Sequence, residues 1–511
     1  MKKIFIIMFL LACWQCMSAQ KETYWWTFGN QNSFNFNLPV TVNDSKGKET
    51  TGMPTVGTSE LTNTEGCFTL SNSKGELMMY GNGRTIWDRT HTPMPNGITG
   101  IDFETYTEGT QSGIIVPYPG SPGKYYVLSI GHKGVTESWN IEEGLISYSV
   151  VDMSLNGGTG DVIPALKDQI LWTTENDEFN NNIAAIKKKG SDNYWIIHRH
   201  LAAPAYTNAI MTMTVWELTP AGFSAPVTYD LDTGDWGQRS SLGYLKFSSD
   251  GRRFISLGTD NSSITYVFSG EFDPETGLVS DMKATYMYKC LPYGIEFSLS
   301  GEELFISYLP SAAIATKRYL GHFTWDKLRS LGTVSDELVP TPFASNHYVV
   351  CIQMHSDGRI YGIEANTRNV YVIMDPEEGA AAEIRVFKNY LLKDHVANYG
   401  LPTFAATFMA MEGDLLFCTN TSGEFTMAIS SYIGAMEVAY TQWDFGDGSA
   451  PIRVTGSGTQ KQSHVYTHPG KYTVTVSAFS AADNLLQSKT LDLKVHPCIL
   501  PVNPNVHLSN N

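Results

Sequence analysis

The feature that most constrains the fold of this 511-residue chain is a repeated unit in which two apolar segments flank a short turn with a glycine. The clearest copies are residues 68–80, 245–255, 295–306 and 352–361, and weaker copies surround Gly123 and Gly190. The turn glycines stand at positions 75, 123, 190, 251, 301 and 358. Apolar segments on both sides of a glycine turn are typical of β-hairpins, so each unit is predicted to be one.

The spacing of these glycines predicts how the hairpins assemble. Successive glycines are 48, 67, 61, 50 and 57 residues apart. A hairpin repeated at this period is typical of a β-propeller, in which small sheets bury their faces by stacking around an axis. Residues 20–415 have room for about seven blades, with six or eight as alternatives. A parallel β-helix would have a shorter period and is less favoured.

The C-terminal part of the chain has a different pattern. Residues 443–449 read WDFGDGS, and two aspartates and two glycines within five residues favour a tight turn after a strand. After a second turn at Pro469–Gly470, Tyr472, Val474 and Val476 alternate with polar residues. This alternation is the period of a half-buried strand. About 80 residues of such strands fit a small β-sandwich.

The order WDFGDGS, then His464-Val-Tyr466, then Pro469-Gly-Lys-Tyr-Thr-Val-Thr-Val resembles the PKD domain, an Ig-like module, over roughly residues 420–497. We therefore predict a PKD domain at 416–498, followed by a short tail at 499–511. The resemblance implies a spacer or an adhesion and binding module. Thr441 stands where the family often has tyrosine, so the packing around it is expected to differ.

The first 19 residues are predicted to be a signal peptide. Lys2 and Lys3 precede the apolar run Ile4–Ala12, and Ala19 offers a small residue at the cleavage site. An alternative is lipidation of Cys13. No later apolar run of 18 residues exists, so no transmembrane segment is expected. We predict an exported protein of the periplasm, the outer-membrane surface or the extracellular space.

The charge of the chain narrows the choice of partners. The formal net charge is −16 at pH 7, and removal of residues 1–19 would take away two lysines and no acid. Such a chain is poorly suited to nucleic acid or to anionic membrane surfaces, because both repel negative charge. The expected partner is a protein or polysaccharide ligand of the envelope or extracellular space.

The cysteines do not indicate a disulfide framework or a zinc site. Five follow the predicted leader, at wide spacing and without a C-x-x-C pair: Cys67, Cys290, Cys351, Cys418 and Cys498. A Cys418–Cys498 disulfide is not favoured, because the two ends of an Ig-like sandwich usually lie at opposite poles.

Two groups of residues contain side chains of the kinds that bind metal ions. His198 and His200 fall on one face of a predicted strand, but no third ligand is evident, and hydrogen-bonded histidines at a blade edge are favoured. Asp230, Asp232 and Asp235 suggest a calcium loop, yet their spacing misses the EF-hand pattern, so a solvated turn is favoured. No metal or other cofactor is predicted.

Two places in the sequence partly match a catalytic or sugar-binding motif. Gly109–Gly113 reads GTQSG, in which the serine stands one place too late for a nucleophile elbow. Trp236, in a predicted loop, could stack on a sugar ring, although a packing role is favoured for any single tryptophan. No catalytic residue is predicted, and the ligand-binding residues stay unassigned.

A broader resemblance rests on motifs in a fixed order along the chain. They are Trp26–Gly29, Phe34–Asn37, Thr64–Cys67, Thr110–Ser112, Ile114–Pro117, Val151–Gly158, Tyr293–Ser298 and Gly400–Phe404. Together they resemble the N-terminal propeller-like region of large Bacteroidetes cell-surface proteins, the gliding-motility-associated or type IX secretion (type B sorting) proteins. Those proteins commonly place PKD domains after the propeller. Residues 499–511 are too few for their C-terminal sorting domain, so none is expected.

Two classes of function follow from these features. The favoured one is a non-enzymatic binding or scaffolding protein of the bacterial envelope, with the propeller as ligand platform and the PKD domain as spacer or adhesion module. The alternative is a glycan-active hydrolase that uses paired carboxylates in the propeller funnel. Fold alone does not decide between these classes.

Overall fold

The computed structural model describes residues 21–496, except for a set of internal segments. Those segments are 101–103, 106–108, 136–140, 176–180, 202–209, 233–242, 260–263, 289, 311–318, 335–348, 407–415, 419–421, 430–431, 434–435 and 469. Cys13, Asp235, Trp236 and Cys498 therefore lie outside the described residues. The chain divides into two compact units between Ala410 and Met411.

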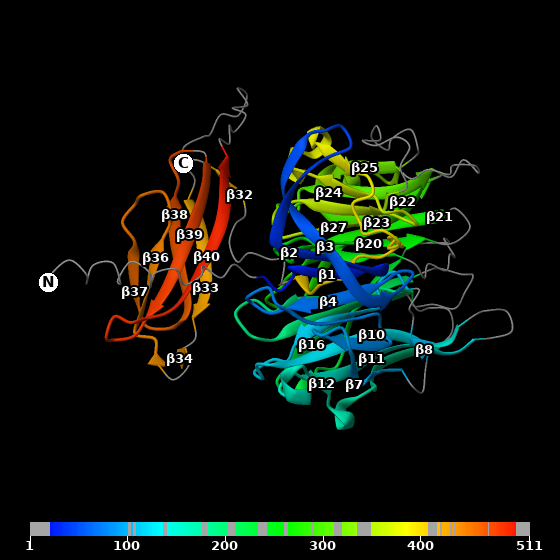
Figure 1. Ribbon diagram of the computed structural model, residues 1–511, viewed down its shortest axis with the longest axis horizontal. Coiled ribbons are helices and arrows are strands. Elements are labelled where there is room, and N and C mark those ends of the chain that lie inside the picture. Colours follow the sequence, from blue (N-terminus) through cyan, green and yellow to red (C-terminus); the bar gives the residue numbers. More distant parts are fainter. Residues whose placement is uncertain are drawn as a thin grey trace. The chain divides into compact units, whose positions relative to one another are not determined.

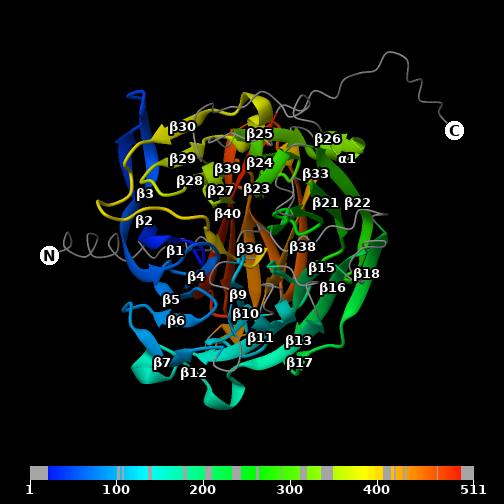
Figure 2. The same cartoon turned by 90° about the vertical axis from the view of Figure 1, so that its right-hand side faces the viewer.

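The N-terminal unit contains seven β-sheets within the described residues, and Figure 2 shows them arranged in a ring, with β4 (Cys67–Ser71), β9 (Gly113–Pro117) and β27 (Val349–Met354) among the strands on its inner side. The first sheet has β1 (Trp25–Phe28), β2 (Asn30–Asn43) and β3 (Glu49–Thr62). The second has β4 (Cys67–Ser71), β5 (Leu77–Gly81), β6 (Thr85–Asp88), β7 (Pro93–Ile98) and β31 (Pro402–Thr403). The third has β8 (Glu104–Thr105), β9 (Gly113–Pro117), β10 (Lys124–Val135), β11 (Ile141–Asp152), β12 (Asp161–Val162) and β13 (Gln169–Glu175).

The other four sheets continue in chain order. The fourth has β14 (Ala184–Lys187), β15 (Tyr194–Leu201), β16 (Ile210–Thr219), β17 (Gly222–Phe223) and β18 (Val227–Asp232). The fifth has β19 (Leu245–Phe247), β20 (Arg253–Thr259), β21 (Ile264–Phe272), β22 (Val279–Tyr288) and β26 (Thr333–Val334). The sixth has β23 (Cys290–Phe297), β24 (Glu303–Pro310) and β25 (Tyr319–Thr324), and the seventh has β27 (Val349–Met354), β28 (Ile360–Glu364), β29 (Val370–Ile373) and β30 (Ile384–Phe387).

Helices are few and short in the described residues: η1 (Asn156–Gly158), η2 (Pro164–Leu166), α1 (Trp325–Ser330) and η4 (Pro376–Ala381). None of them has the length and apolar character needed to cross a membrane. The predicted all-β class, a propeller followed by a sandwich, is confirmed.

The six repeated glycines lie in hairpin turns, as the sequence repeat predicts. All six glycines have φ between 71° and 85°, a left-handed conformation that glycine adopts without steric cost. Gly123 lies between β9 and β10 of the third sheet, and each of the other five lies between the first and second strand of its sheet. Six of the seven sheets therefore contain a predicted hairpin. In four turns the glycine N–H donates to the carbonyl three residues earlier, at Asn72, Ser248, Ser298 or His355.

The remaining sheet, β1–β2–β3, was not found by the repeat. Its first two strands are joined at Gly29, without a Ser/Asp-Gly turn, and β2 and β3 are each 14 residues long. This sheet meets the seventh one through a stack of Phe36 on His355, with ring centroids 3.6 Å apart. The predicted number of about seven blades holds because this sheet completes the ring.

The chain after the seventh sheet returns to the first two sheets and closes the ring. The Val396 carbonyl accepts hydrogen bonds from Asn30 N (3.1 Å) and Asn32 Nδ2 (2.8 Å). Tyr399 N donates to Thr64 O (2.7 Å). β31 then pairs in parallel with β4. Ring closure therefore depends on residues more than 330 positions apart in the sequence.

The C-terminal unit is a small sandwich, drawn in orange and red in Figure 1. One sheet has the order β32 (Leu416–Cys418), β40 (Leu485–His496), β39 (Gly470–Phe479), β36 (Tyr440–Asp444) and β37 (Ile452–Thr455). The smaller sheets pair β33 (Ser422–Ile429) with β38 (Gly458–Val465), and β34 (Tyr432–Ile433) with β35 (Met436–Glu437). Its core includes Phe425, Trp443, Phe445, Tyr466 and Val474.

Candidate functional site

The chain's own closing segment, residues 396–406, fills the centre of the propeller with its last six residues, 401–406. Leu401 belongs to the same buried cluster as Tyr244 and Cys351, and the ring of Phe404 lies 6.1 Å from that of Trp26. Ala405 is fully buried in the core of the third and fourth sheets. Because this segment touches strands from around the ring, it occupies the place of an open axial channel.

A small cavity of about 50 Å³ remains beside this segment. The polar or aromatic residues on its wall include Gln111, Lys246, Glu296, Gln353, Thr403 and Phe404. Ser248 and Ser298, which begin two of the glycine turns, also line it, so the cavity lies at the turn end of the inner strands. It has room for a few water molecules but is far smaller than a typical small-molecule site.

An ion pair forms the polar part of this cavity. Lys246 Nζ lies 3.1 Å from Glu296 Oε2 and 2.5 Å from Gln353 Oε1. The side chains of Lys246 and Glu296 are 11% and 5% exposed. The Glu296 carboxylate also accepts Met354 N (3.0 Å) and Phe297 N (3.1 Å). A buried carboxylate with these partners has its charge and its lone pairs satisfied.

This polar group could have been found by aligning the repeats, although the sequence analysis did not single it out. Lys246, Glu296 and Gln353 each stand five residues before a turn glycine and between two apolar residues. The same position in three other repeats is apolar: Leu70, Tyr118 and Ala185. A shared position on the first strand of each sheet places these side chains at the same height on the axis.

The GTQSG segment ties neighbouring sheets together. Gln111 Nε2 donates to Ile183 O (3.1 Å), and Leu245 N donates to Gln111 Oε1 (2.8 Å). Ser112 Oγ donates to Gly66 O (2.8 Å), and both side chains are buried. The segment therefore acts as an inter-sheet link.

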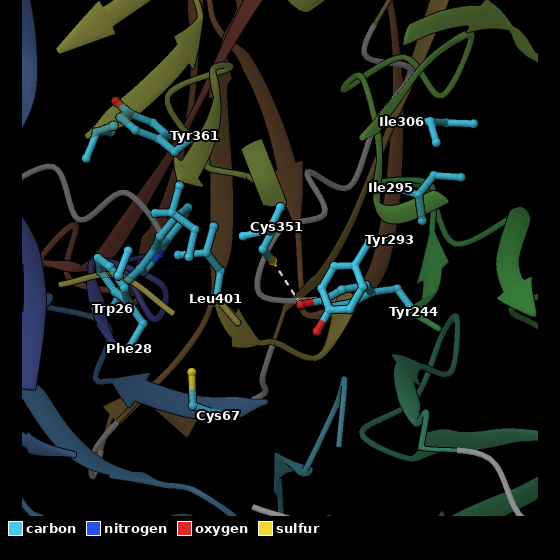
Figure 3. Packing of buried hydrophobic residues seen from close by; sticks show 14 of the residues in the cluster. Trp26, Phe28, Cys67, Tyr244, Tyr293, Ile295, Ile306, Cys351, Tyr361 and Leu401 are labelled. Carbon is cyan, nitrogen blue, oxygen red and sulfur yellow. Dashed lines mark hydrogen bonds between the residues drawn. The ribbon is translucent and has the colours of Figure 1, made fainter. Parts of the chain in front are cut away.

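Two buried cysteines, Cys67 and Cys351, belong to the same buried cluster as Leu401. Cys351 Sγ is 2.8 Å from the Tyr244 hydroxyl, a hydrogen bond drawn as a dashed line beside Leu401 in Figure 3. Cys67 Sγ donates to Thr27 O (3.2 Å). Burial raises the pKa of Cys351 to about 11 and that of Cys67 well above its ordinary value. Both are free thiols that stay protonated at neutral pH.

His198 and His200 lie on one face of β15, as predicted. Their rings stack with centroids 5.7 Å apart, and the Trp172 ring lies 5.2 Å and 4.8 Å from them. Asn182 O is 2.7 Å from His198 Nδ1. Burial lowers the pKa of His200 to about 4 and that of His198 well below its ordinary value, so both are neutral. Over the described ranges, no three His, Cys, Asp or Glu side chains are grouped to hold a metal ion.

The predicted turn at Asp230 and Asp232 is wrong. Both residues belong to β18, which pairs with β16. Tyr229 and Leu231 on this strand pack against the core, which favours an extended strand with the aspartates outward. Asp230 accepts a hydrogen bond from Thr212 Oγ1 (2.7 Å).

The WDFGDGS segment folds as the tight corner that its glycines predict. Gly446 and Gly448 have φ of 73° and 85°. Asp447 Oδ2 lies 2.8 Å from His464 Nε2, and the His464 ring stacks on Phe445 at 4.1 Å. The Tyr466 hydroxyl donates to Phe445 O (3.0 Å). The three sequence motifs of this unit therefore meet at one corner of the sandwich.

Residues 409–493 match the PKD domain. This match covers most of the predicted domain at 416–498 and accounts for the C-terminal sandwich.

Solved structures similar to the chain include propeller-like proteins. A putative 6-phosphogluconolactonase from Bacteroides fragilis has 10% identity and a TM-score of 0.35, over 74% of this chain and 98% of that one. Hsv2 from Kluyveromyces lactis has 9% identity and a TM-score of 0.31, over 71% and 97%. An endo-arabinase from Bacteroides thetaiotaomicron has 12% identity and a TM-score of 0.27, over 56% and 95%. At this identity and these TM-scores, none of the three bears on activity.

Proposed function

We propose that this chain is an exported, non-enzymatic binding or scaffolding protein of the bacterial envelope or cell surface. The propeller is the platform for a protein or polysaccharide ligand, and the PKD domain is a spacer or second point of adhesion. The PKD match supports the extracellular setting, because this domain is typical of surface proteins. The relationship to gliding-motility-associated proteins stays a prediction.

The surroundings of Glu296, the carboxylate of the axial cavity, are the main support for the non-enzymatic part of the proposal. Glycoside hydrolysis needs two carboxyl groups about 5–9.5 Å apart, one of which must accept or donate a proton. Of the described residues that line the axial cavity, Glu296 is the sole carboxylate. It is bound by Lys246 and by two backbone N–H groups, and the described lining supplies no second carboxyl group to pair with it.

The closing segment supports the same conclusion. A propeller hydrolase would need an axial funnel that admits a sugar ring. Here Thr403 and Phe404 occupy the wall of a cavity of about 50 Å³, much less than a sugar ring requires. The ligand of this propeller is therefore expected on an outer surface of the ring.

The test combines a binding assay with an activity assay on the full chain. We expect saturable binding to a protein or polysaccharide in an array of envelope components, and no release of reducing sugar above that of heat-denatured protein. Turnover that is lost in Glu296→Gln would overturn the proposal in favour of the hydrolase alternative. Lys246→Met/Glu296→Leu, which replaces the pair with apolar groups of similar size, is the control for folding of the ring. If the array retained nothing, the binding proposal would fail.

A further inference from the structure

A second hollow lies where the first sheet meets the closing segment. It is a depression of about 340 Å³ that is largely open to solvent. Six residues line it: Asn30, Thr62, Asn63, Thr64, Val396 and Asn398. We call these six residues the asparagine hollow.

The polar side chains of this hollow are neutral, and several are unused by the fold. Asn30, Thr62 and Thr64 make no side-chain hydrogen bond to any residue that the structure describes. Asn63 is 5% exposed, and its Oδ1 atom is buried without a hydrogen-bond partner in the described chain. Thr62 and Thr64 are exposed, so their hydroxyls are open to a ligand, whereas buried polar atoms such as Asn63 Oδ1 are normally satisfied and the lack of a partner indicates a ligand or water.

The walls of the hollow are held by the hydrogen bonds that close the ring. Asn30 N donates to Val396 O (3.1 Å), and Asn398 Nδ2 donates to Asn63 O (2.6 Å). Asn63 N donates to Gly29 O (3.1 Å). A ligand that binds here meets groups already fixed in position, which lowers the entropic cost of binding.

The chemistry of the lining selects the class of ligand. None of the six lining residues carries a charge, whereas phosphate, carboxylate and divalent cations are normally held by charged groups. Amide and hydroxyl groups can both donate and accept, which matches the hydroxyl groups of a sugar. We propose that the asparagine hollow binds one neutral sugar residue of a polysaccharide. This inference rests on the proposed binding function and assigns it a site.

The test uses the full chain and calorimetric titration with neutral methyl glycosides and short neutral oligosaccharides, with glucuronate and glucose 6-phosphate as charged comparisons. We expect saturable binding of at least one neutral ligand at millimolar concentrations, and much weaker binding of the charged ones. Thr62→Val/Thr64→Val keeps the shape of the exposed side chains and removes two hydroxyls. It should weaken binding about tenfold, as expected for the loss of one or two hydrogen bonds.

Thr58→Val is the matched control. Thr58 is exposed on the same face of β3 as Thr62 but does not line the hollow. This variant should bind the glycoside as the wild type does, and the melting curves of all variants should coincide. Equal binding by Thr62→Val/Thr64→Val and wild type would place the sugar elsewhere and overturn this inference, while the binding function itself would stand. If no neutral glycoside bound at all, the hollow would hold water only and the inference would likewise fail.

Discussion

Thr441 belongs to a buried hydrogen-bond network in the core of the PKD domain. Its hydroxyl donates to Gln460 Oε1 (2.5 Å), and Trp443 Nε1 donates to both groups at 3.2 Å and 3.1 Å. Both Thr441 and Trp443 are buried. A tyrosine at this position would have filled space with a ring, whereas threonine completes a buried hydrogen-bond network.

Asp447 gives a prediction at the same scale. Burial opposes its ionisation, but hydrogen bonds from Ser449 and His464 lower its pKa to about 2. Because this lies below the ordinary value of about 3.9, the ionised group stabilises the folded state above pH 4, and the contribution is lost as the pH falls toward 2. Asp447→Asn should reduce the free energy of unfolding at neutral pH by up to about 1 kcal/mol, a discounted figure because the side chain is partly exposed.

Urea unfolding of the full chain at neutral pH and at low pH measures this effect. The difference between Asp447→Asn and the wild type should disappear at low pH. Asp394→Asn, a change at an exposed aspartate of the propeller, is the control and should have no effect. A pH-independent difference would show that the carboxylate charge is not the source of the stability.

At the scale of the structural element, the six glycine hairpins share one left-handed backbone conformation at the turn glycine. The residues that surround this glycine differ from one hairpin to the next. A Cβ atom at Gly190 would meet nothing within 4 Å, whereas at Gly301 it would lie 3.0 Å from Ser248 Cβ of the neighbouring sheet. The turn conformation is therefore common to the hairpins, while the contact between sheets is specific to each turn.

This difference predicts unequal costs for the same substitution. Gly190→Ala should lower the free energy of unfolding by about 1 kcal/mol, the cost of a left-handed residue with a Cβ. Gly301→Ala should cost more, because the added methyl also displaces Ser248. Thermal melting of the two variants gives the comparison, and equal losses would mean that the inter-sheet contact is not tight.

The sequence predicted the strands and hairpins better than the sites. The reason is that hairpins depend on residues close together in the sequence, whereas the sites join residues far apart in it. A hairpin is specified by neighbouring residues, so six glycine turns indicated six sheets. The sheet with β1 lacks that local signal. The asparagine hollow joins Asn30 and Asn63 to Asn398, and no local pattern links positions so far apart. Lys246 and Glu296 were accessible only through alignment of one repeat on another.

At the scale of the whole molecule, the closing segment joins the end of the propeller to its beginning. It links the seventh sheet to the first two through Val396 and Tyr399, and then enters the centre at Leu401. Gly400 lies between these contacts. A Cβ there would stand 1.8 Å from Glu65 O, so this position accepts no larger residue without movement of the backbone.

Gly400→Ala should therefore loosen the ring as a whole. We expect a loss of about 3 kcal/mol or more in the stability of the propeller, seen as a lower melting temperature of its transition. The transition of the PKD domain should not move. Gly332→Ala is the matched control, because a Cβ there meets nothing within 4 Å. Identical melting curves for the two variants would contradict this account of closure.

The position of the closing segment also sets the order of events when the chain folds. The bond from Asn32 to Val396 spans 364 positions, so the loop that it closes includes nearly the whole propeller. Contacts of such high sequence separation form late and slow the folding of β-rich domains. The second sheet gains its strand β31, and the first sheet its contacts with Val396, only after synthesis has passed residue 403. Until then a newly made chain exposes the edge of β4, and chaperone binding would protect it.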